Sequence, residues 1–372
     1  MKFSNILGQA SNTALLRQLV QQGRTPHALL LLGPEGSGKL TAALALAQYM
    51  LCTNRGEDAC GECSHCKKAA KWIHPDIHYT FPTVGTNITS ERFLPEWRTA
   101  LSENPYMDVN QWLQRIGAEN KQGNINKEEC VRIVRKLSLK AFEGQVKVLI
   151  LWLPEYLGRE GNRLLKLIEE PPAQTHFILV AENQELILNT ILSRCQLVKF
   201  NALEDAAVVR GLQEQHGLSE DRALEIAHLA DGNFNEALEL MAKAENDLAN
   251  LFLDWLRKCY LGNGLELLEW SDRLADLGRE QQKHLLRYAL HFLEEFLLLK
   301  ATGRTALRLR ASELETARRM QQVIELDQLE QLVERLTDAI YHIERNANPK
   351  VLFLHLGIQI HKILRRKSLV PA

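Results

Sequence analysis

The sequence predicts an α/β domain of the P-loop type, followed by an all-helical part. Over residues 1–200, short apolar runs alternate with helical stretches, the pattern of a parallel sheet flanked by helices. The glycine-rich segment GPEGSGKL (33–40) directly follows the apolar run ALLLL (28–32), as a P-loop follows its strand. From Asp205 onward the strand signals disappear, and amphipathic helices are predicted to the end of the chain. A chain of 372 residues is long enough for two or three such domains.

The composition is that of an ordinary globular protein and argues against several functional classes. Apolar residues make up 45% and charged residues 24% of the chain. Because the formal net charge is -1, any contact with nucleic acid is expected to come from a local patch. The apolar runs are too short to span a bilayer, and MKFSNILGQ (1–9) lacks the apolar core of a signal peptide. We therefore expect a cytoplasmic protein without a membrane partner.

The strands of the α/β part are predicted from apolar runs of strand length. The first is HALLLLG (27–33), and the Ala- and Leu-rich segment 39–52 is expected to be the helix after it. Three further buried strands are expected at VKVLILWL (146–153), THFILVAEN (175–183) and CQLVKF (195–200). A helix over 158–172 should end at Pro171, because the residue before a proline is pushed out of the α region.

The rest of the chain is predicted to be helical, apart from one insertion. Residues 79–125 carry few strand or motif signals, so we interpret them as an insertion whose role the sequence does not define. Two amphipathic helices after Asp205 each close on a glycine, Gly217 and Gly232. In the segment 326–345 apolar residues share one face, which favours helix-bundle packing over a dedicated coiled-coil partner site.

The segment 33–41 matches the P-loop pattern G-x-x-x-x-G-K-[ST] except at its last position. The glycines and the lysine that would surround phosphate are Gly33, Gly36, Gly38 and Lys39. Backbone N–H groups at the following helix N-terminus can bind phosphate whatever residue comes next. The hydroxyl that should hold Mg²⁺ is replaced by Leu40, and Thr41 lies one residue later, about 100° further around the helix.

A second group needed for ATP hydrolysis is also missing from its expected place. An acidic residue at the end of a buried strand normally orients Mg²⁺ and the attacking water. Here Trp152 and Leu153 stand at that position, and the first carboxylate, Glu155, follows a proline. An indole cannot coordinate Mg²⁺. We therefore predict that this site does not hydrolyse ATP at a useful rate, and that it binds ATP or ADP weakly or not at all.

Four of the seven cysteines are close together in the sequence: Cys52, Cys60, Cys63 and Cys66. Two overlapping C-x₂-C steps and a fourth thiol upstream can close a tetrahedral zinc site with no open position, which predicts a structural zinc. A redox dithiol at CGEC (60–63) is the alternative, and a third cysteine at the same interval weighs against it. Cys130 and Cys259 are expected to be small buried apolar residues.

Arg194, in TILSRCQLVKF (190–200), directly precedes a predicted strand. Two interpretations of this residue stay open from the residues alone. It can be a solvated arginine in a local ion pair. It can instead be an arginine finger, which stabilises the charge of ATP bound to a neighbouring subunit.

Several segments, in this order, resemble the subunits of the bacterial DNA polymerase III clamp loader, a family within the AAA+ superfamily. They are FSNILGQ, PHALLLLGPEGSGK, the four cysteines, HPD (74–76), NRLLKLIEEPP (162–172) and TILSRC (190–195). The resemblance implies an AAA+ RecA-like P-loop domain over 1–200, with the zinc module at 52–66 and the insertion at 79–125. It further implies a small helical lid domain over 201–244 and a helical collar domain over 245–372.

The departures from the family pattern all resemble the non-motor, delta-prime type of subunit. Motor subunits keep a hydroxyl after the P-loop lysine, an Asp-Glu pair on the second strand and an arginine in the lid. The corresponding residues here are Leu40, Trp152 with Leu153, and Asn235. The resemblance therefore implies a chain without its own ATPase activity, which presents Arg194 to an adjacent motor subunit of the polymerase holoenzyme.

The resemblance also implies the partners. They are the motor subunits and the delta subunit in a hetero-oligomeric ring, the sliding clamp, and primed DNA, contacted through its phosphates. The competing interpretation is an active motor subunit, in which Thr41 and Glu155 would have to replace the missing groups. A zinc-stabilised DNA-binding module without ring partners is a further alternative, and the near-zero net charge weighs against it.

Overall fold

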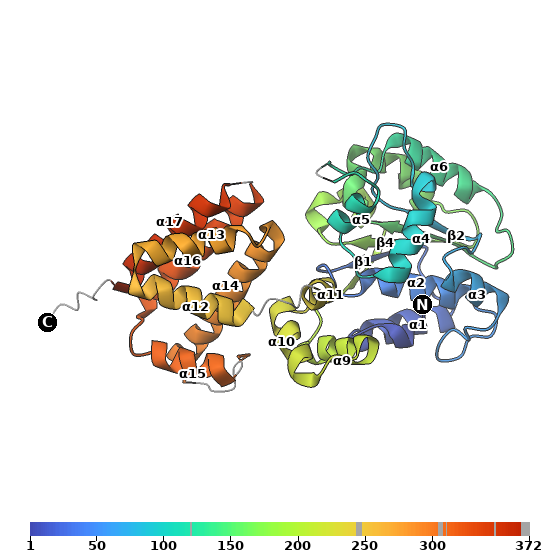
Figure 1. The fold of residues 1–372 in the computed structure, drawn as a ribbon. Coiled ribbons are helices and arrows are strands. Elements are labelled where there is room, and N and C mark those ends of the chain that lie inside the picture. Colours follow the sequence, from blue (N-terminus) through green and yellow to red (C-terminus); the bar gives the residue numbers. More distant parts are fainter. Residues whose placement is uncertain (120, 243–247, 304–307, 310, 346, 366–372) are drawn as a thin grey trace. The chain divides into compact units, whose positions relative to one another are not determined.

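The computed structural model describes residues 1–119, 121–242, 248–303, 308–309, 311–345 and 347–365 (Figure 1). The chain divides into two compact units, Met1–Glu239 and Leu240–Ala372. The expected domain division at 200/201 and 244/245 stays a prediction, and the second of these boundaries lies outside the described residues. Among the residues described, no helix is long and apolar enough to cross a membrane.

A five-stranded parallel sheet forms the centre of the first unit. The strands are β1 (Ala28–Leu32), β2 (Ile77–Thr80), β3 (Lys147–Trp152), β4 (Thr175–Ala181) and β5 (Gln196–Lys199). Their order is β2-β3-β4-β1-β5, and all neighbouring pairs are parallel. The four strands predicted from apolar runs are present. The expectation that the last of them is buried is wrong, because β5 is an edge strand and three of its four residues are exposed. Strand β2 is missed, because a four-residue edge strand containing polar residues carries little apolar signal.

Helices cover both faces of the sheet, because strand side chains point alternately to two apolar clusters. Leu31 of β1 belongs to the cluster that includes α2 (Lys39–Leu51), a helix whose 13 residues are all buried. Leu30 belongs to the other cluster, together with the apolar face of α6 (Lys127–Ser138). The sheet is therefore a middle layer, and the P-loop-like segment leaves it at the carboxyl end of β1.

The segment 158–172, expected to be one helix, differs from the prediction. Residues Pro154–Leu164 form the 3-10 helix η3, which is interrupted at Gly158 (φ 49, ψ -135). Only α7 (Leu165–Glu169) is α-helical. The helix does end before Pro171, as predicted. Gly158 has the positive φ that glycine readily adopts, so it marks the start of this segment and does not explain the 3-10 geometry that continues to Leu164.

The insertion expected over 79–125 starts later than predicted, because Tyr79 and Thr80 are the last residues of β2. The excursion that follows is closed at its base. Backbone N–H···O bonds join Thr83 and Asn124 in both directions, at 2.9 and 2.8 Å. The excursion contains the 3-10 helix η2 (Ser90–Phe93) and the helices α4 (Leu94–Glu103) and α5 (Val109–Arg115). Neither α-helix is predicted from the sequence. Asp108 and Gln111 form a capping box at the start of α5, which is a signal that could have located it.

Three helices follow β5: α9 (Asp205–His216), α10 (Glu220–Ala230) and α11 (Phe234–Ala242). As predicted, α9 closes on Gly217, which is left-handed with φ 68. The first of these helices packs tightly on the N-terminal segment, because a Cβ at Gly8 would lie 2.9 Å from the Cβ of Ala207. The unit also contains α1 (Ala10–Gln21) near its N-terminus and α3 (Ser64–Ala70) after α2.

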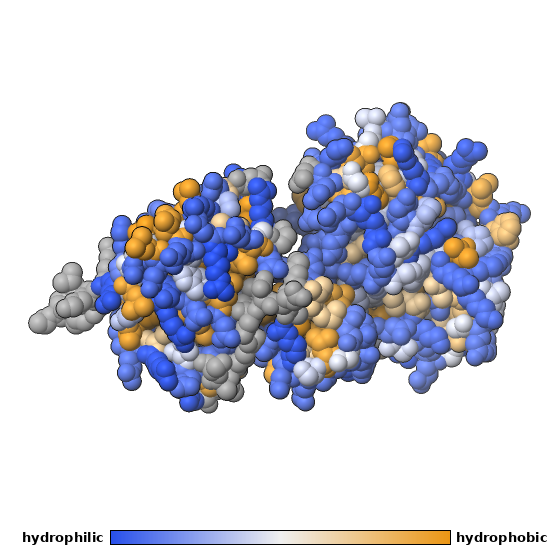
Figure 2. All heavy atoms as spheres, in the orientation of Figure 1, coloured by the Kyte–Doolittle hydropathy of each residue, from blue (hydrophilic) through white to orange (hydrophobic). Residues whose placement is uncertain are grey.

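Among its described residues, the second unit contains helices joined by turns and no strand. Its helices are α12 (Leu248–Leu261), α13 (Gly264–Ala275), α14 (Arg279–Thr302), α15 (Ala311–Met320), α16 (Leu326–Glu344) and α17 (Pro349–Arg365). Leu329, Leu332 and Leu336 of α16 are buried, and this helix contacts α14 and α17. The expected bundle packing of 326–345 is confirmed. The face of the molecule in Figure 2 is mostly hydrophilic, with hydrophobic side chains scattered among polar ones.

Candidate functional site

The P-loop-like segment (residues 33–41) has the predicted strand–loop–helix arrangement. Gly36 and Gly38 adopt left-handed conformations, with φ of 64° and 85°. Gly38 is the N-cap residue of α2. The backbone N–H groups of the first helical turn therefore face the loop, the local geometry of an anion-binding cradle.

The side chain of Lys39 folds back onto its own loop. Its Nζ donates hydrogen bonds to the carbonyl oxygen of Pro34 at 2.5 Å and to Oγ of Ser37 at 3.4 Å. The residue is only 5% exposed. Burial lowers the pKa of Lys39, although nearby carboxylates act in the opposite direction. The ammonium group is thus engaged by groups of this chain at the place where it would meet a phosphate.

Three carboxylates act on the charge of Lys39: Glu182, Glu155 and Glu35. Oε1 of Glu155 accepts hydrogen bonds from the backbone N–H groups of Glu182 at 2.5 Å and Asn183 at 2.8 Å, just after β4. Burial raises the pKa of Glu155, and it raises the pKa of Glu182 to about 7 although Lys39 opposes the shift. Carboxylates in this position repel the charge of a polyphosphate.

The residues at the two magnesium-binding positions are used for packing and for local hydrogen bonds. Leu40 is buried, and Oγ1 of Thr41 donates a hydrogen bond to the carbonyl oxygen of Gly38 at 2.6 Å. Trp152, at the end of β3, packs against Trp97 of α4 with ring centroids 5.2 Å apart. The side chains that stand at the two magnesium-binding positions, Leu40 and Trp152, are thus buried in packing contacts.

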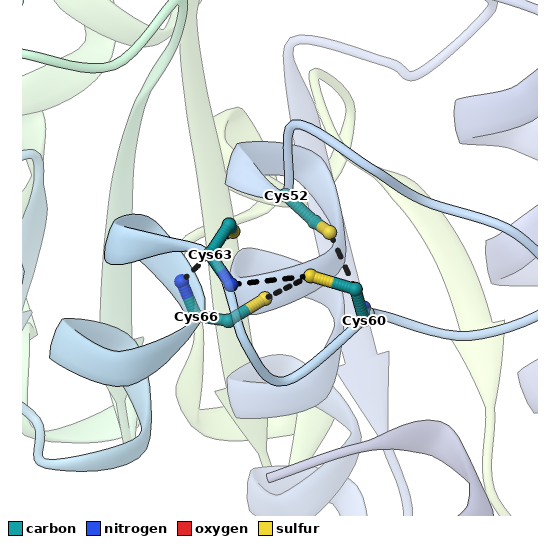
Figure 3. A group of neighbouring side chains, drawn as sticks. All are labelled: Cys52, Cys60, Cys63 and Cys66. Carbon is teal, nitrogen blue, oxygen red and sulfur yellow. Dashed lines mark hydrogen bonds between the residues drawn. The ribbon is translucent and has the colours of Figure 1, made fainter.

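The four clustered cysteines come together at the C-terminal end of α2 and the start of α3 (Figure 3). Their four Sγ atoms all lie within 4.8 Å of one another, and those of Cys60 and Cys66 are 3.9 Å apart. Four thiolates around a tetrahedral Zn²⁺, with bonds of about 2.3 Å, would be about 3.8 Å apart. The cluster therefore has the dimensions of a zinc site.

Backbone N–H groups already stabilise negative charge on this cluster. The N–H of Cys60 donates to Sγ of Cys52, that of Cys63 to Sγ of Cys60, and that of Cys66 to Sγ of Cys63, at 3.3 to 3.4 Å. Burial raises the pKa of Cys63, but hydrogen bonds from the backbone of Cys66 and Thr53 outweigh it and lower the pKa to about 6. Burial raises the pKa of the Cys66 thiol. The donor set suits a cation that binds thiolates.

Arg194 lies between α8 (Asn189–Leu192) and β5. Its guanidinium donates to the carbonyl oxygen of Thr190 at 2.8 Å, to Oγ of Ser193 at 3.3 Å and to Oε2 of Glu169 at 3.2 Å. The side chain is 30% exposed. The local ion pair considered for this residue is thus present, on a side chain that solvent reaches.

Arg194 and the P-loop-like segment are at opposite ends of the sheet. Gln196, the first residue of β5, pairs with Leu29 of β1, and the two strands are parallel. The P-loop-like segment begins after the carboxyl end of β1, whereas Arg194 precedes the amino end of β5. The rise along a strand separates the two positions by about 13 Å or more. Arg194 therefore cannot serve the P-loop-like segment of its own chain.

Sequence reasoning missed residues that the fold brings beside the P-loop-like segment. Tyr106 belongs to the connection between α4 and α5, and Glu182 directly follows β4. Asn235, at the position where the resemblance places an arginine in motor subunits, is 3% exposed and accepts a hydrogen bond from Nδ2 of Asn104 at 2.7 Å. These contacts join residues far apart in the sequence, and no local motif marks them.

The chain thus combines a parallel α/β domain and an altered nucleotide cradle with a four-cysteine cluster and an arginine before the edge strand. These are the features by which the sequence resembles clamp loader subunits. The family model described as DNA polymerase III, delta subunit, matches residues 8–204, and the chain belongs to this family. The resemblance to clamp loader subunits of the delta-prime type is confirmed.

The chain is similar to curated proteins of two kinds. It is 29% identical over 62% of its length to DNA polymerase III subunit delta' of Bacillus subtilis, and 26% identical over 74% to that of Escherichia coli, covering 58% and 71% of those proteins. It is 24% identical over 95% of its length to subunit tau of B. subtilis, covering 60% of it. The chain thus spans about three fifths of the length of both B. subtilis relatives.

Among solved structures, a DNA polymerase III gamma subunit-related protein from Thermotoga maritima has a TM-score of 0.42. That structure is 17% identical in sequence, and the match covers 95% of this chain and 100% of the other.

Proposed function

We propose that this chain is a non-hydrolysing AAA+ subunit of the DNA polymerase III clamp loader that supplies Arg194 in trans to the ATP site of a neighbouring subunit. The observation that carries the proposal is the position of Arg194. It is solvent-accessible and lies at the end of the sheet away from the P-loop-like segment of its own chain. An arginine so placed can complete a nucleotide site only in another chain, where it stabilises the charge of the γ-phosphate.

The P-loop-like segment supports the non-hydrolysing half of the proposal. Lys39 is bonded within its own loop, and Glu155 is bonded to backbone N–H groups after β4. An active motor subunit, the competing function, would require Thr41 to leave its bond to Gly38 and Glu155 to leave those N–H groups. It would also require a ligand for Mg²⁺ in place of Trp152.

The proposed ring also implies roles for the remaining parts of the chain. Residues 201–244 form the lid domain and residues 245–372 the collar that holds the ring together. The partners are the motor subunits and delta, with the sliding clamp and primed DNA as the substrates of loading. Opening the clamp and placing it on DNA is work of the assembled ring, driven by ATP bound to the motor subunits.

The cysteine cluster is proposed to hold a structural zinc through Cys52, Cys60, Cys63 and Cys66. Such a zinc would cross-link the end of α2 to α3. All four ligands are protein thiolates, so the site has no position for a substrate or water. Its contribution is to the stability of the first unit.

The test is ATP turnover by the purified chain, alone and in the loader reconstituted with clamp and primed DNA. We expect no turnover by the isolated chain, and a large fall in the turnover of the loader when it carries Arg194→Ala. Arg222→Ala is the control, because Arg222 is also ion-paired and has a similar exposure of 35%. Turnover by the isolated chain that Lys39→Ala abolishes would instead identify a motor subunit.

A further inference from the structure

The insertion at 79–125 has no part in the function proposed above. It leaves the sheet after β2 and returns to its own starting point at the Thr83–Asn124 bridge. Its helices α4 and α5 (Figure 1) bury two tryptophans, Trp97 and Trp112, together with a few smaller apolar residues. The part of this excursion farthest along the chain from its closed base is the connection between α4 and α5.

The connection between α4 and α5 reaches the start of the nucleotide cradle. The ring of Tyr106, 8% exposed, lies against the backbone there, since a Cβ at Gly38 would be 3.5 Å from its Cε1. The same ring meets Phe234, the first residue of α11, edge to face with centroids 4.8 Å apart. The aromatic ring thus fills the space between the N-terminus of α2 and the start of the proposed lid helix α11.

Two polar contacts continue this connection along α11. Nδ2 of Asn104 donates to Oδ1 of Asn235 at 2.7 Å, and Nε2 of Gln111 donates to Oε1 of Glu239 at 2.6 Å. Asn235 is 3% exposed, so its hydrogen bond is shielded from water. The insertion is therefore hydrogen-bonded to α11 at two positions one helical turn apart, Asn235 and Glu239.

The loop and the proposed lid also meet directly, without a layer between them. The backbone N–H of Phe234 donates to the carbonyl oxygen of Gly36 at 3.2 Å. A Cβ at Gly36 would lie 2.6 Å from the backbone N of Phe234, and Gly36 has a φ of 64°, so a larger residue is strongly disfavoured there. Residues of the chain itself therefore join the P-loop-like segment to the start of α11.

We propose that residues 104–111 of the insertion take the place of a nucleotide and hold the lid helices closed over the P-loop-like segment. The inference rests on the proposed function, because a subunit that uses no nucleotide needs another means of fixing its lid. In this proposal, the insertion permanently occupies the position that a nucleotide would take. The lid of this subunit would accordingly keep one position throughout the ATP cycle of its neighbours.

Hydrogen–deuterium exchange of the full-length chain tests this proposal. In the wild type we expect slow exchange in peptides covering 205–239, unchanged by adding ADP or ATP with Mg²⁺. Asn104→Ala should speed exchange there by about 3- to 10-fold, because it removes one shielded hydrogen bond. Tyr106→Ala should speed it by about 30-fold or more, and peptides from β3 and β4 should not change in either variant.

Thr99→Ala is the matched control, because Thr99 lies on the exposed side of α4 and its hydroxyl bonds only within that helix. Asn104→Ala keeps the test decisive should Tyr106→Ala not fold. Equal lid exchange in wild type and Asn104→Ala would overturn the proposal, as would a wild-type lid that becomes protected only when nucleotide is added. The measurement uses the isolated chain, so its outcome does not depend on whether Arg194 acts on a neighbour.

Discussion

Arg194 and Glu169 form an ion pair at the amino end of the sheet, with Nη2 of the arginine 3.2 Å from Oε2 of the glutamate. The two side chains are 30% and 57% exposed, so water and salt screen their attraction. A γ-phosphate carries more charge than one carboxylate and offers several oxygens to a guanidinium. The pair thus keeps Arg194 at the surface in a form that an anionic ligand of a neighbouring chain can capture.

Removing Arg194 should therefore have little effect on folding. Exposed ion pairs contribute about 0.2–1 kcal/mol, so Arg194→Ala should lower the free energy of unfolding by less than about 1 kcal/mol. Urea denaturation of wild type, Arg194→Ala and Glu169→Gln measures this directly. A loss of several kcal/mol would mean that any activity defect of Arg194→Ala reflects misfolding and not a missing arginine finger.

The cysteine cluster should bind one zinc per chain. We expect Cys63→Ser to lose the metal and to lower the melting temperature by about 5 °C or more, because the bound metal stabilises only the folded chain. Metal analysis by mass spectrometry and thermal unfolding, with and without chelator, measure both effects. Cys195→Ser is the control, since Cys195 is half-buried and lies outside the cluster. A wild-type chain that folds with no zinc would rule out this site.

Glu182 should make the stability of the chain depend on pH near neutrality. Its folded-state pKa of about 7 lies above the ordinary value of 4.5, so the folded chain binds the proton more tightly. The favourable contribution is complete below pH 4.5 and is lost as the pH rises through 7. Between these values the free energy of unfolding of the wild type should fall by roughly 1–3 kcal/mol relative to that of Glu182→Gln, so the comparison of the two isolates the contribution of Glu182 from that of other groups that titrate in this range. Glu185→Gln, at an exposed neighbouring position, should keep it.

Restoring an acidic residue at Trp152 should damage the chain without restoring hydrolysis. Trp152 is 2% exposed and packs in an aromatic cluster with Trp97, which itself stacks on Phe81 at 4.3 Å. Trp152→Asp leaves a cavity and buries a carboxylate, which should cost more than about 4 kcal/mol. Trp152→Phe should fold, and it should lower the free energy of unfolding by less than Trp152→Asp does. A folded Trp152→Asp chain that hydrolyses ATP would show that only this residue separates it from a motor subunit.

Strands β1, β3 and β4 could be predicted from sequence because they are built from apolar runs, and buried parallel strands need such runs. Strand β5 was located from a similar run, although three of its four residues are exposed. The cysteine cluster could be predicted for a similar reason. Cys60, Cys63 and Cys66 are close in sequence, so little folding is needed to bring their sulfurs together. Local patterns were sufficient in both cases.

The insertion could not be predicted because its contacts are not local. Asn104 and Asn235 are 131 residues apart, and although Asn235 stands at the position of the lid arginine, nothing in the sequence pairs it with Asn104. The helix expected over 158–172 is α-helical only over Leu165–Glu169, and no residue pattern marks the 3-10 geometry that precedes it. The raised pKa of Glu182 likewise depends on burial, which requires the complete fold.

The most direct measurement is the single-turnover rate of ATP hydrolysis by the reconstituted clamp loader, with nucleotide affinity measured in parallel. With Arg194→Ala in this chain, we predict that ATP still binds while hydrolysis at the adjacent site slows by about 10³-fold or more. Arg222→Ala should behave as the wild type does. If loaders carrying Arg194→Ala assemble normally and hydrolyse ATP at the wild-type rate, this chain does not supply an arginine finger.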